Sequence, residues 1–258
     1  MGRSWTFTDL EFLALWEETG AEFLPKPLIF ASRTEWWDDH LANMERAKDA
    51  LRDRDPDFAE VMYALRTPDV LVEVHGWDGR DRTAPDASIR MLGVRHGELG
   101  YLVTQQPGET YRHSTGFTVT ECYANELAGE VVSGLPETAA GRGRDIVLAE
   151  PEHTEEFDYG YGLSLAHETM EGTVVNRAAD FLAAPAPSVG TIDVVQGHSR
   201  FGPRGITRHR VEWRDVADDG RYVVTGDHPP VASPADRNVM VSTVNTRISE
   251  VIMALEDE

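Results

Sequence analysis

Two short segments of similar sequence, placed at a constant offset of 121 positions, constrain the fold of this chain more than any other feature. They read Gly-Tyr-Leu-Val-Thr at 100–104 and Arg-Tyr-Val-Val-Thr at 221–225. Each follows two other short runs that are rich in β-branched residues, and such runs predict β-strands. We therefore predict that one structural plan, a strand meander with helices around it, occurs twice in the chain.

The strands of this plan can be placed along the sequence. In the first half, Val70, Val72 and Val74 alternate with other residues, and a second run follows at 89–94. The loop from Trp77 to Ala87 joins these two runs and is rich in Gly, Asp, Arg and Pro, which are turn formers. In the second half we expect strands at 191–196 and 208–213. Two further short strands are expected, one after Pro25 and Pro27 within 24–30 and one at 145–149.

The helices of the first half carry recognisable start signals. Thr8 and Glu11 form a capping box, which predicts a helix from about Asp9 to Thr19 that ends at Gly20. Thr34 is placed to cap a second helix over 35–53, with an inner face of Trp37, Leu41, Met44 and Leu51. Asp55-Pro56 opens a third, with an inner face of Phe58, Val61, Met62 and Leu65.

Helices are also expected around the second pentapeptide and directly after each copy. The first of the two following helices opens at Thr118 with Glu121, and the last opens at Ser233-Pro234 with Asp236. The last helix has a seam of Val241, Val244, Ile248, Val251 and Leu255. A helix before the second meander has a face made of Leu163, His167, Met170, Val174 and Phe181.

Together these elements predict an α+β protein with a quasi-two-fold internal duplication. Its strands pool into a central antiparallel sheet flanked by two helical bundles. The halves are 1–136 and 156–258, each helix-meander-helix, and 137–155 is the joint between them in one compact domain.

The charge of the chain excludes several classes of partner. Its formal net charge is -21, with 45 Asp and Glu against 24 Lys and Arg, so nucleic acid and anionic membrane surfaces are disfavoured. The sequence starts without an apolar signal core and has no stretch of about 20 apolar residues that could insert into a membrane. We expect a cytoplasmic protein.

Few residues have the spacing that catalysis or metal binding requires. Cys122 is the single cysteine, and none of the nine histidines has the i, i+4 partner of a helical metal site, so we expect no catalytic residue, cofactor or metal. Gly162 to Ala166 resembles a relaxed nucleophile elbow around Ser164, with His167 nearby. A serine-type hydrolase around Ser164 and His167 therefore stays open as an alternative, as does a non-catalytic, self-assembling scaffold.

Several segments resemble those of EspG-family proteins. They include the opening from Trp5 to Glu17 followed by Leu24 to Leu28, and then Val74 to Gly76. The likeness continues, in the order that the family has, at Gly100 to Val103 with Gln105 to Thr110, at Gly116 to Cys122, and at Asp219 to Tyr222 with Pro234 to Asp236. The resemblance implies a quasi-two-fold fold and a cytosolic chaperone of ESX type VII secretion. Such a chaperone binds the apolar helical tip of the PPE member of a PE/PPE heterodimer, keeps the pair soluble and delivers it for secretion.

A docking surface for such a partner must combine apolar anchors with a polar rim. We place it on the second-half hairpin from His198 to Trp213 together with the final helix. The expected contact residues are Phe201, Ile206, His209 and Val211, with Trp77 and Arg80 of the long loop as a second candidate. Val211 and Trp213 alternate with charged residues, which also fits a place in the core. The free chain is expected to be a monomer or a weak homodimer.

Overall fold

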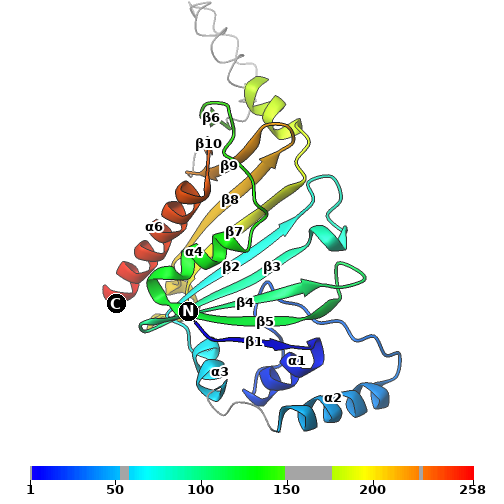
Figure 1. The fold of residues 1–258 in the computed structure, drawn as a ribbon. Coiled ribbons are helices and arrows are strands. Elements are labelled where there is room, and N and C mark those ends of the chain that lie inside the picture. Colours follow the sequence, from blue (N-terminus) through cyan, green and yellow to red (C-terminus); the bar gives the residue numbers. More distant parts are fainter. Residues whose placement is uncertain (1, 53–57, 149–175, 227–228) are drawn as a thin grey trace, which may run out of the picture.

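The fold is taken from a computed structural model that describes residues 2–52, 58–148, 176–226 and 229–258 (Figure 1). Its helices are α1 (Asp9–Glu18), α2 (Trp37–Leu51), α3 (Phe58–Arg66), α4 (Leu127–Ser133), α6 (Arg237–Glu256), a helical segment at 176–183, and the short 3-10 turns η1 (Pro85–Ala87), η2 (Ala124–Glu126) and η3 (Gly202–Gly205). Its strands are β1 (Ser4–Phe7), β2 (Val70–Trp77), β3 (Ile89–His96), β4 (Leu99–Pro107), β5 (Ser114–Tyr123), β6 (Ile146–Val147), β7 (Ser188–Gln196), β8 (Arg208–Val216), β9 (Gly220–Thr225) and β10 (Val231–Pro234).

The ten strands that the structure describes belong to one sheet in the order β1-β5-β4-β3-β2-β7-β8-β9-β10-β6. Neighbouring strands are antiparallel throughout. The pairing of β2 with β7, from Val70 opposite Gln196 to Trp77 opposite Val189, joins the strands of the two halves of the chain. The predicted α+β class and central antiparallel sheet are confirmed, whereas the internal duplication stays a prediction.

The helices cover the two faces of the sheet differently. α4 and α6 lie together over one face, where they pack on a core that crosses the β2–β7 junction and includes Trp213, Ile192 and Leu127 (Figure 1). α1 and α3 pack on the opposite face of β3, β4 and β5 around Phe12, Phe58 and Phe117. α2 packs on α1 and not on the sheet.

The start of α1 follows the prediction. Thr8 Oγ1 accepts a hydrogen bond from the backbone N–H of Glu11 (3.2 Å), and a Glu11 carboxylate oxygen accepts one from the Thr8 N–H (2.8 Å). These bonds satisfy two donors that a helix start leaves free. Gly20 follows the helix with a φ of 81°, a conformation that glycine adopts without strain. The inner face predicted for α3 is confirmed, because Phe58, Val61, Met62 and Leu65 are buried.

Two predicted elements of the first half are wrong. Thr118 and Glu121 do not open a helix, because 114–123 is the strand β5, which pairs with both β1 and β4. Its alternation of Phe117 and Val119 with threonines has the period of a strand. Residues 24–30 form no strand, since Pro25 and Pro27 cannot donate to a neighbour; the Ile29 N–H instead donates to the Gln105 side chain (2.9 Å).

The start and inner face of α2 also differ from the prediction. The helix begins at Trp37 with Trp36 as its N-cap, and the Thr34 hydroxyl contacts Ser32 Oγ (2.8 Å). Met44 is buried, whereas Trp37 and Leu41 are exposed, because α2 packs through its other side on α1 and on Leu24 and Phe30.

The final helix was predicted with a start that is a few residues too early. Ser233 and Pro234 belong to β10, and Asp236 is the N-cap of α6, accepting a bond from the Val239 N–H (2.8 Å). Val244, Ile248 and Val251 of the predicted seam are buried, whereas Val241 and Leu255 are partly exposed. A helix was also predicted before the second meander. Its residue Phe181 is buried in the helical segment 176–183. The other residues of its predicted face, Leu163, His167, Met170 and Val174, lie outside the described residues.

The described part of the joint, residues 137–148, packs against the second half. Gly141 and Gly143 lie against the Tyr222 ring, and a Cβ on Gly141 would come 2.2 Å from that ring. The Gly143 N–H donates to the Tyr222 hydroxyl (3.0 Å), which donates to Asp219 (2.7 Å). The short strand predicted near 145–149 is β6, which pairs with β10.

A buried ion pair holds the same region. The Arg221 guanidinium donates two bonds to the Asp215 carboxylate (2.6 and 2.7 Å) and one to the Pro136 carbonyl (2.8 Å). Both side chains are only 4% exposed. The pair therefore links β8 and β9 to the chain that leaves the first half.

Removal of one member of this pair should destabilise the protein strongly. Among the described residues, Arg221→Met leaves the buried Asp215 carboxylate with only the Thr138 hydroxyl as a partner (3.2 Å). A loss of about 3–5 kcal/mol in the free energy of unfolding is expected. Urea denaturation measures it. The exposed pair Lys48–Glu45 gives the control, since Glu45→Ala should leave the unfolding midpoint almost unchanged. Equal effects of the two substitutions would contradict the role given to the buried pair.

Cys122 should react slowly in the native protein. Burial, with a contribution from Glu130, Glu126 and Glu121, raises the pKa of its thiol to about 12. At pH 8 the reactive thiolate is then on the order of 10⁻⁴ of the population. Labelling with N-ethylmaleimide should be slow in the native protein at pH 8 and become fast in denaturant. Native labelling as fast as that of glutathione would show the thiol to be accessible.

Candidate functional site

The predicted docking residues lie in two groups, at opposite ends of the paired strands β2 and β7 in the middle of the sheet. Trp77 ends β2 opposite Val189, and Arg80 follows in the connection to β3. Phe201 and Ile206 lie in the connection between β7 and β8, beyond the other end of the same strands. Seven residues of β7 separate the two ends, a distance of about 23 Å at 3.3 Å per residue. The structure therefore does not bring the two groups together.

The β7–β8 connection presents Phe201 to solvent. Its side chain is 67% exposed, and the Arg200 guanidinium lies 5.1 Å from the centre of its ring. The connection is held by Glu258, two residues beyond the end of α6, because its carboxylate accepts bonds from the Arg200 N–H (2.8 Å) and from Nε2 of Gln196 at the end of β7 (2.9 Å). Ile206 is partly exposed beside it. This end thus offers an aromatic anchor on a tethered turn.

Val211 and His209 point toward α6. Val211 is fully buried in the core, where it lies opposite Ile192 in the sheet. A buried side chain cannot touch a partner, so the prediction of Val211 as a contact residue is wrong for the folded chain. His209 is partly exposed, with Nδ1 3.6 Å from the Glu250 carboxylate, which Arg247 also contacts at 2.8 Å.

A hollow of about 700 Å³ lies beside His209. β8 pairs with β9 only from Glu212 onward, so residues 208–211 have no strand on that side among the residues described. The hollow therefore borders an open strand edge, a feature to which an extended segment of another chain can add.

The opposite end of the sheet carries a cluster of cationic and aromatic side chains. The Arg82 guanidinium lies 4.2 Å from the centre of the Trp77 ring, and the His75 ring is 5.0 Å from that of Trp77. Burial, followed by the charges of Arg90 and Arg82, lowers the pKa of His75, so this imidazole is neutral at pH 7. Arg80 is exposed, and its backbone N–H donates to Asp78 (2.7 Å).

A charged strip on β2, β7 and β8 connects the two ends. The Arg210 guanidinium donates to both oxygens of Asp193 (2.9 and 3.0 Å), and Arg208 contacts Glu73 (3.3 Å). The two arginines are exposed, whereas Asp193 is buried and the Glu73 side chain is only 15% exposed. These pairs form a polar surface on this face, between the two apolar ends.

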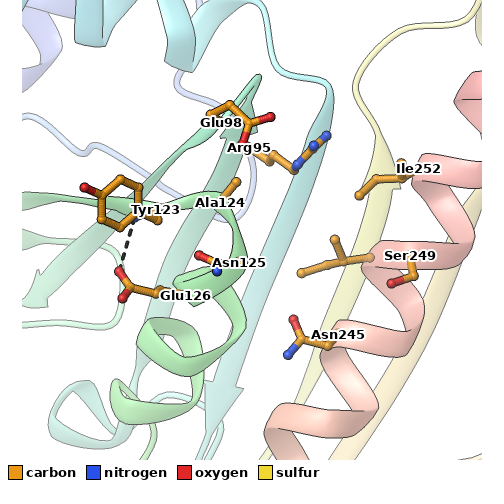
Figure 2. Close-up of a pocket in the computed structure, with 10 residues that line it drawn as sticks. Arg95, Glu98, Tyr123, Ala124, Asn125, Glu126, Asn245, Ser249 and Ile252 are labelled. Atoms are coloured by element: carbon orange, nitrogen blue, oxygen red, sulfur yellow. Dashed lines mark hydrogen bonds between the residues drawn. The ribbon is translucent and has the colours of Figure 1, made fainter.

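A groove on the other face was not predicted. It has a volume of about 530 Å³ and runs between η2 and α6, with Asn125 and Glu126 on one wall and Asn245, Ser249 and Ile252 on the other (Figure 2). Tyr123, 66% exposed, stands at its edge. A second hollow of about 740 Å³ shares Tyr123, Asn125 and Glu126 with it. The sequence signal here, a tyrosine at the end of an alternating run, was hidden by the helix wrongly expected to open at Thr118.

The described residues contain no group of three or more His, Cys, Asp or Glu side chains arranged to hold a metal ion. Ser164 and His167 lie outside the described residues. No helix within the described ranges is long and apolar enough to cross a membrane. What the described surface offers is protein docking: apolar anchors with charged rims, a groove and an open strand edge.

Comparison with known proteins agrees with this. The solved structure of the Mycobacterium tuberculosis type VII secretion system chaperone EspG5 in complex with a PE25-PPE41 dimer is similar in fold. Its TM-score is 0.57 at 14% sequence identity, with 95% of this chain and 96% of that chain covered. No curated protein matches the sequence significantly. The family model of the EspG family matches residues 8–246. The resemblance noted in the sequence is confirmed, and the chain belongs to the EspG family.

Proposed function

We propose that this chain is a cytoplasmic chaperone of an ESX type VII secretion system that binds a PE/PPE heterodimer. The observation that carries the proposal is the EspG family match over residues 8–246. The shared fold with EspG5, which is solved in complex with a PE25-PPE41 dimer, supports it over almost the whole chain. The chaperone shields the apolar helical tip of the PPE protein, because an exposed patch of several hundred Å² would otherwise drive aggregation.

The docking surface that we propose has two contact points, one at each end of the paired strands β2 and β7. Phe201 and Ile206, with His209 at the hollow beside β8, form the first. Trp77 and Arg80 form the second. The charged strip with Arg208 and Arg210 lies between them and selects a partner by charge, since rim charges act mainly on specificity and association rate. Val211 supports this surface from the core.

We also infer the internal duplication from the sheet. The two pentapeptides lie in β4 and β9, and each of these strands is third from the β2–β7 junction in its own half. Leu102 and Val223 of the two copies pack in the same core cluster, and each meander is followed by a helix, α4 or α6, on that face. A two-fold axis near the junction accounts for both equivalences. We propose the free chain to be a monomer or a weak homodimer.

The function is tested by co-expressing the chain with a PE/PPE pair from its own genome. One stoichiometric complex should elute from a size-exclusion column, and the pair should be less soluble without the chain. Absence of a complex with every PE/PPE pair of that genome would refute the proposal. Labelling of Ser164 by a fluorophosphonate would instead favour the hydrolase alternative.

The contact residues are tested in the same assay. Phe201→Asp and Trp77→Ala should each reduce capture of the cognate pair, by about tenfold or more at a central anchor. Tyr63→Ala is a matched control, because Tyr63 is an exposed aromatic residue on α3 outside the proposed surface. Unchanged capture with both substitutions would remove this surface while leaving the chaperone function itself intact.

A further inference from the structure

The N-terminal end of α2 carries an exposed apolar patch that neither the fold nor the proposed docking surface uses. Trp36 is 71% exposed, Trp37 69% and Leu41 46%. Trp37 and Leu41 lie one turn apart and so share a face of the helix. The His40 ring is 5.3 Å from that of Trp37 and 5.9 Å from that of Phe30, which extends the group. We call Trp36, Trp37 and Leu41 the tryptophan patch.

The stability of α2 does not require this patch. The helix is held through its other side, where Met44 and Ala47 pack with Leu13 and Ala14 of α1. Trp36 occupies the N-cap without a side-chain hydrogen bond to the backbone. Serine, threonine, asparagine or aspartate at that position satisfies a free N–H, which tryptophan cannot do. Folding alone thus gives no reason for Trp36, and two adjacent exposed tryptophans are typical of interfaces.

The rim of the patch is acidic. Glu35, Asp38 and Asp39 have no cationic partner among the residues that the structure describes. Further along α2 the charges are paired, Lys48 with Glu45 and Arg52 with Asp49. Asp38 and Asp39 favour the helix start through its dipole, but they also leave a negative field around the indole rings.

We propose that the tryptophan patch docks a segment of another protein in which apolar side chains are flanked by lysine or arginine. The apolar side chains cover the indoles, and the cations lie against the aromatic faces and the unpaired carboxylates. A second copy of this chain fits poorly, because two acidic rims in a protein of net charge -21 would face each other. Anionic membrane surfaces are repelled for the same reason.

This surface is separate from the proposed cargo surface. α2 packs on α1 beside the β1 edge of the sheet, whereas the proposed contact residues lie on β2, β8 and the connections that follow β2 and β7 (Figure 1). Occupation of one surface therefore leaves the other open. The patch provides a second binding activity that does not depend on whether the cargo is a PE/PPE pair.

The test uses the full chain and two synthetic amphipathic 18-residue helical peptides, one of leucine and lysine and one of leucine and glutamate. Binding is measured by fluorescence anisotropy of labelled peptide near physiological salt. The wild-type chain should bind the lysine peptide and not the glutamate peptide. Trp36→Ser with Trp37→Ala should weaken binding of the lysine peptide by about tenfold or more, although every carboxylate remains.

The stability of the same variant separates docking from a structural role. Serine can cap α2, so the melting temperature should stay unchanged or rise while peptide binding falls. Asp38→Asn with Asp39→Asn should weaken binding and reduce its dependence on salt. Tyr123→Ala, an exposed aromatic residue elsewhere, should leave the affinity unchanged.

Two outcomes would overturn the proposal. Equal affinity of the wild type and the tryptophan variant would mean that the peptide binds through general acidity alone. A dimer in sedimentation velocity that the tryptophan substitutions dissolve would assign the patch to a second copy of the chain.

Discussion

The placement of the helices depends on whether each strand has apolar residues on one face or on both, because apolar residues must be buried. β3 carries four consecutive buried residues, Met91 to Val94, so it needs cover on both faces, and it receives α4 on one and α3 on the other. In β8, buried Val211 and Trp213 alternate with Arg210 and Glu212, so one covered face is enough. α6 supplies it. Among the described residues, the helices therefore cover both faces in the first half of the sheet. In the second half α6 covers one face, the segment 176–183 packs on Tyr222 at the other, and the arginines of the charged strip are exposed.

Local sequence patterns were sufficient to predict the elements whose structure is determined by residues within them. The capping box of α1, the inner face of α3 and the alternating strands β2, β7 and β8 were predicted correctly. β1 and β10 were missed, and β5 was taken for a helix, because these segments become strands by pairing with partners far along the chain. Residues 24–30 were predicted to contain a strand and form none. They are apolar, but two prolines leave them without the backbone N–H donors that a strand needs.

Surface residues were harder to predict than core residues, since exposure is decided by what packs next to a side chain. Phe201 is exposed to solvent as expected. Val211 is in the core, because it lies beside Ile192 of β7 and under α6. The reverse error occurred at Trp37 and Leu41, which have the spacing of an inner helix face but no sheet beneath them. The groove beside Tyr123 is formed by η2 and α6, more than 100 residues apart, and no short pattern encodes such a meeting.

The junction between β2 and β7 has a consequence for the time course of synthesis. Roughly 110 residues separate Trp77 at the end of β2 from Ser188 at the start of β7. At about 5–20 residues per second, the ribosome needs on the order of 10 s to make that stretch. Until then β2 has β3 on one side and an unpaired edge of alternating valines on the other, which is a site for wrong pairing. A protein proposed to protect others from aggregation thus passes, on every round of translation, through an interval in which one of its own central strands has an exposed edge.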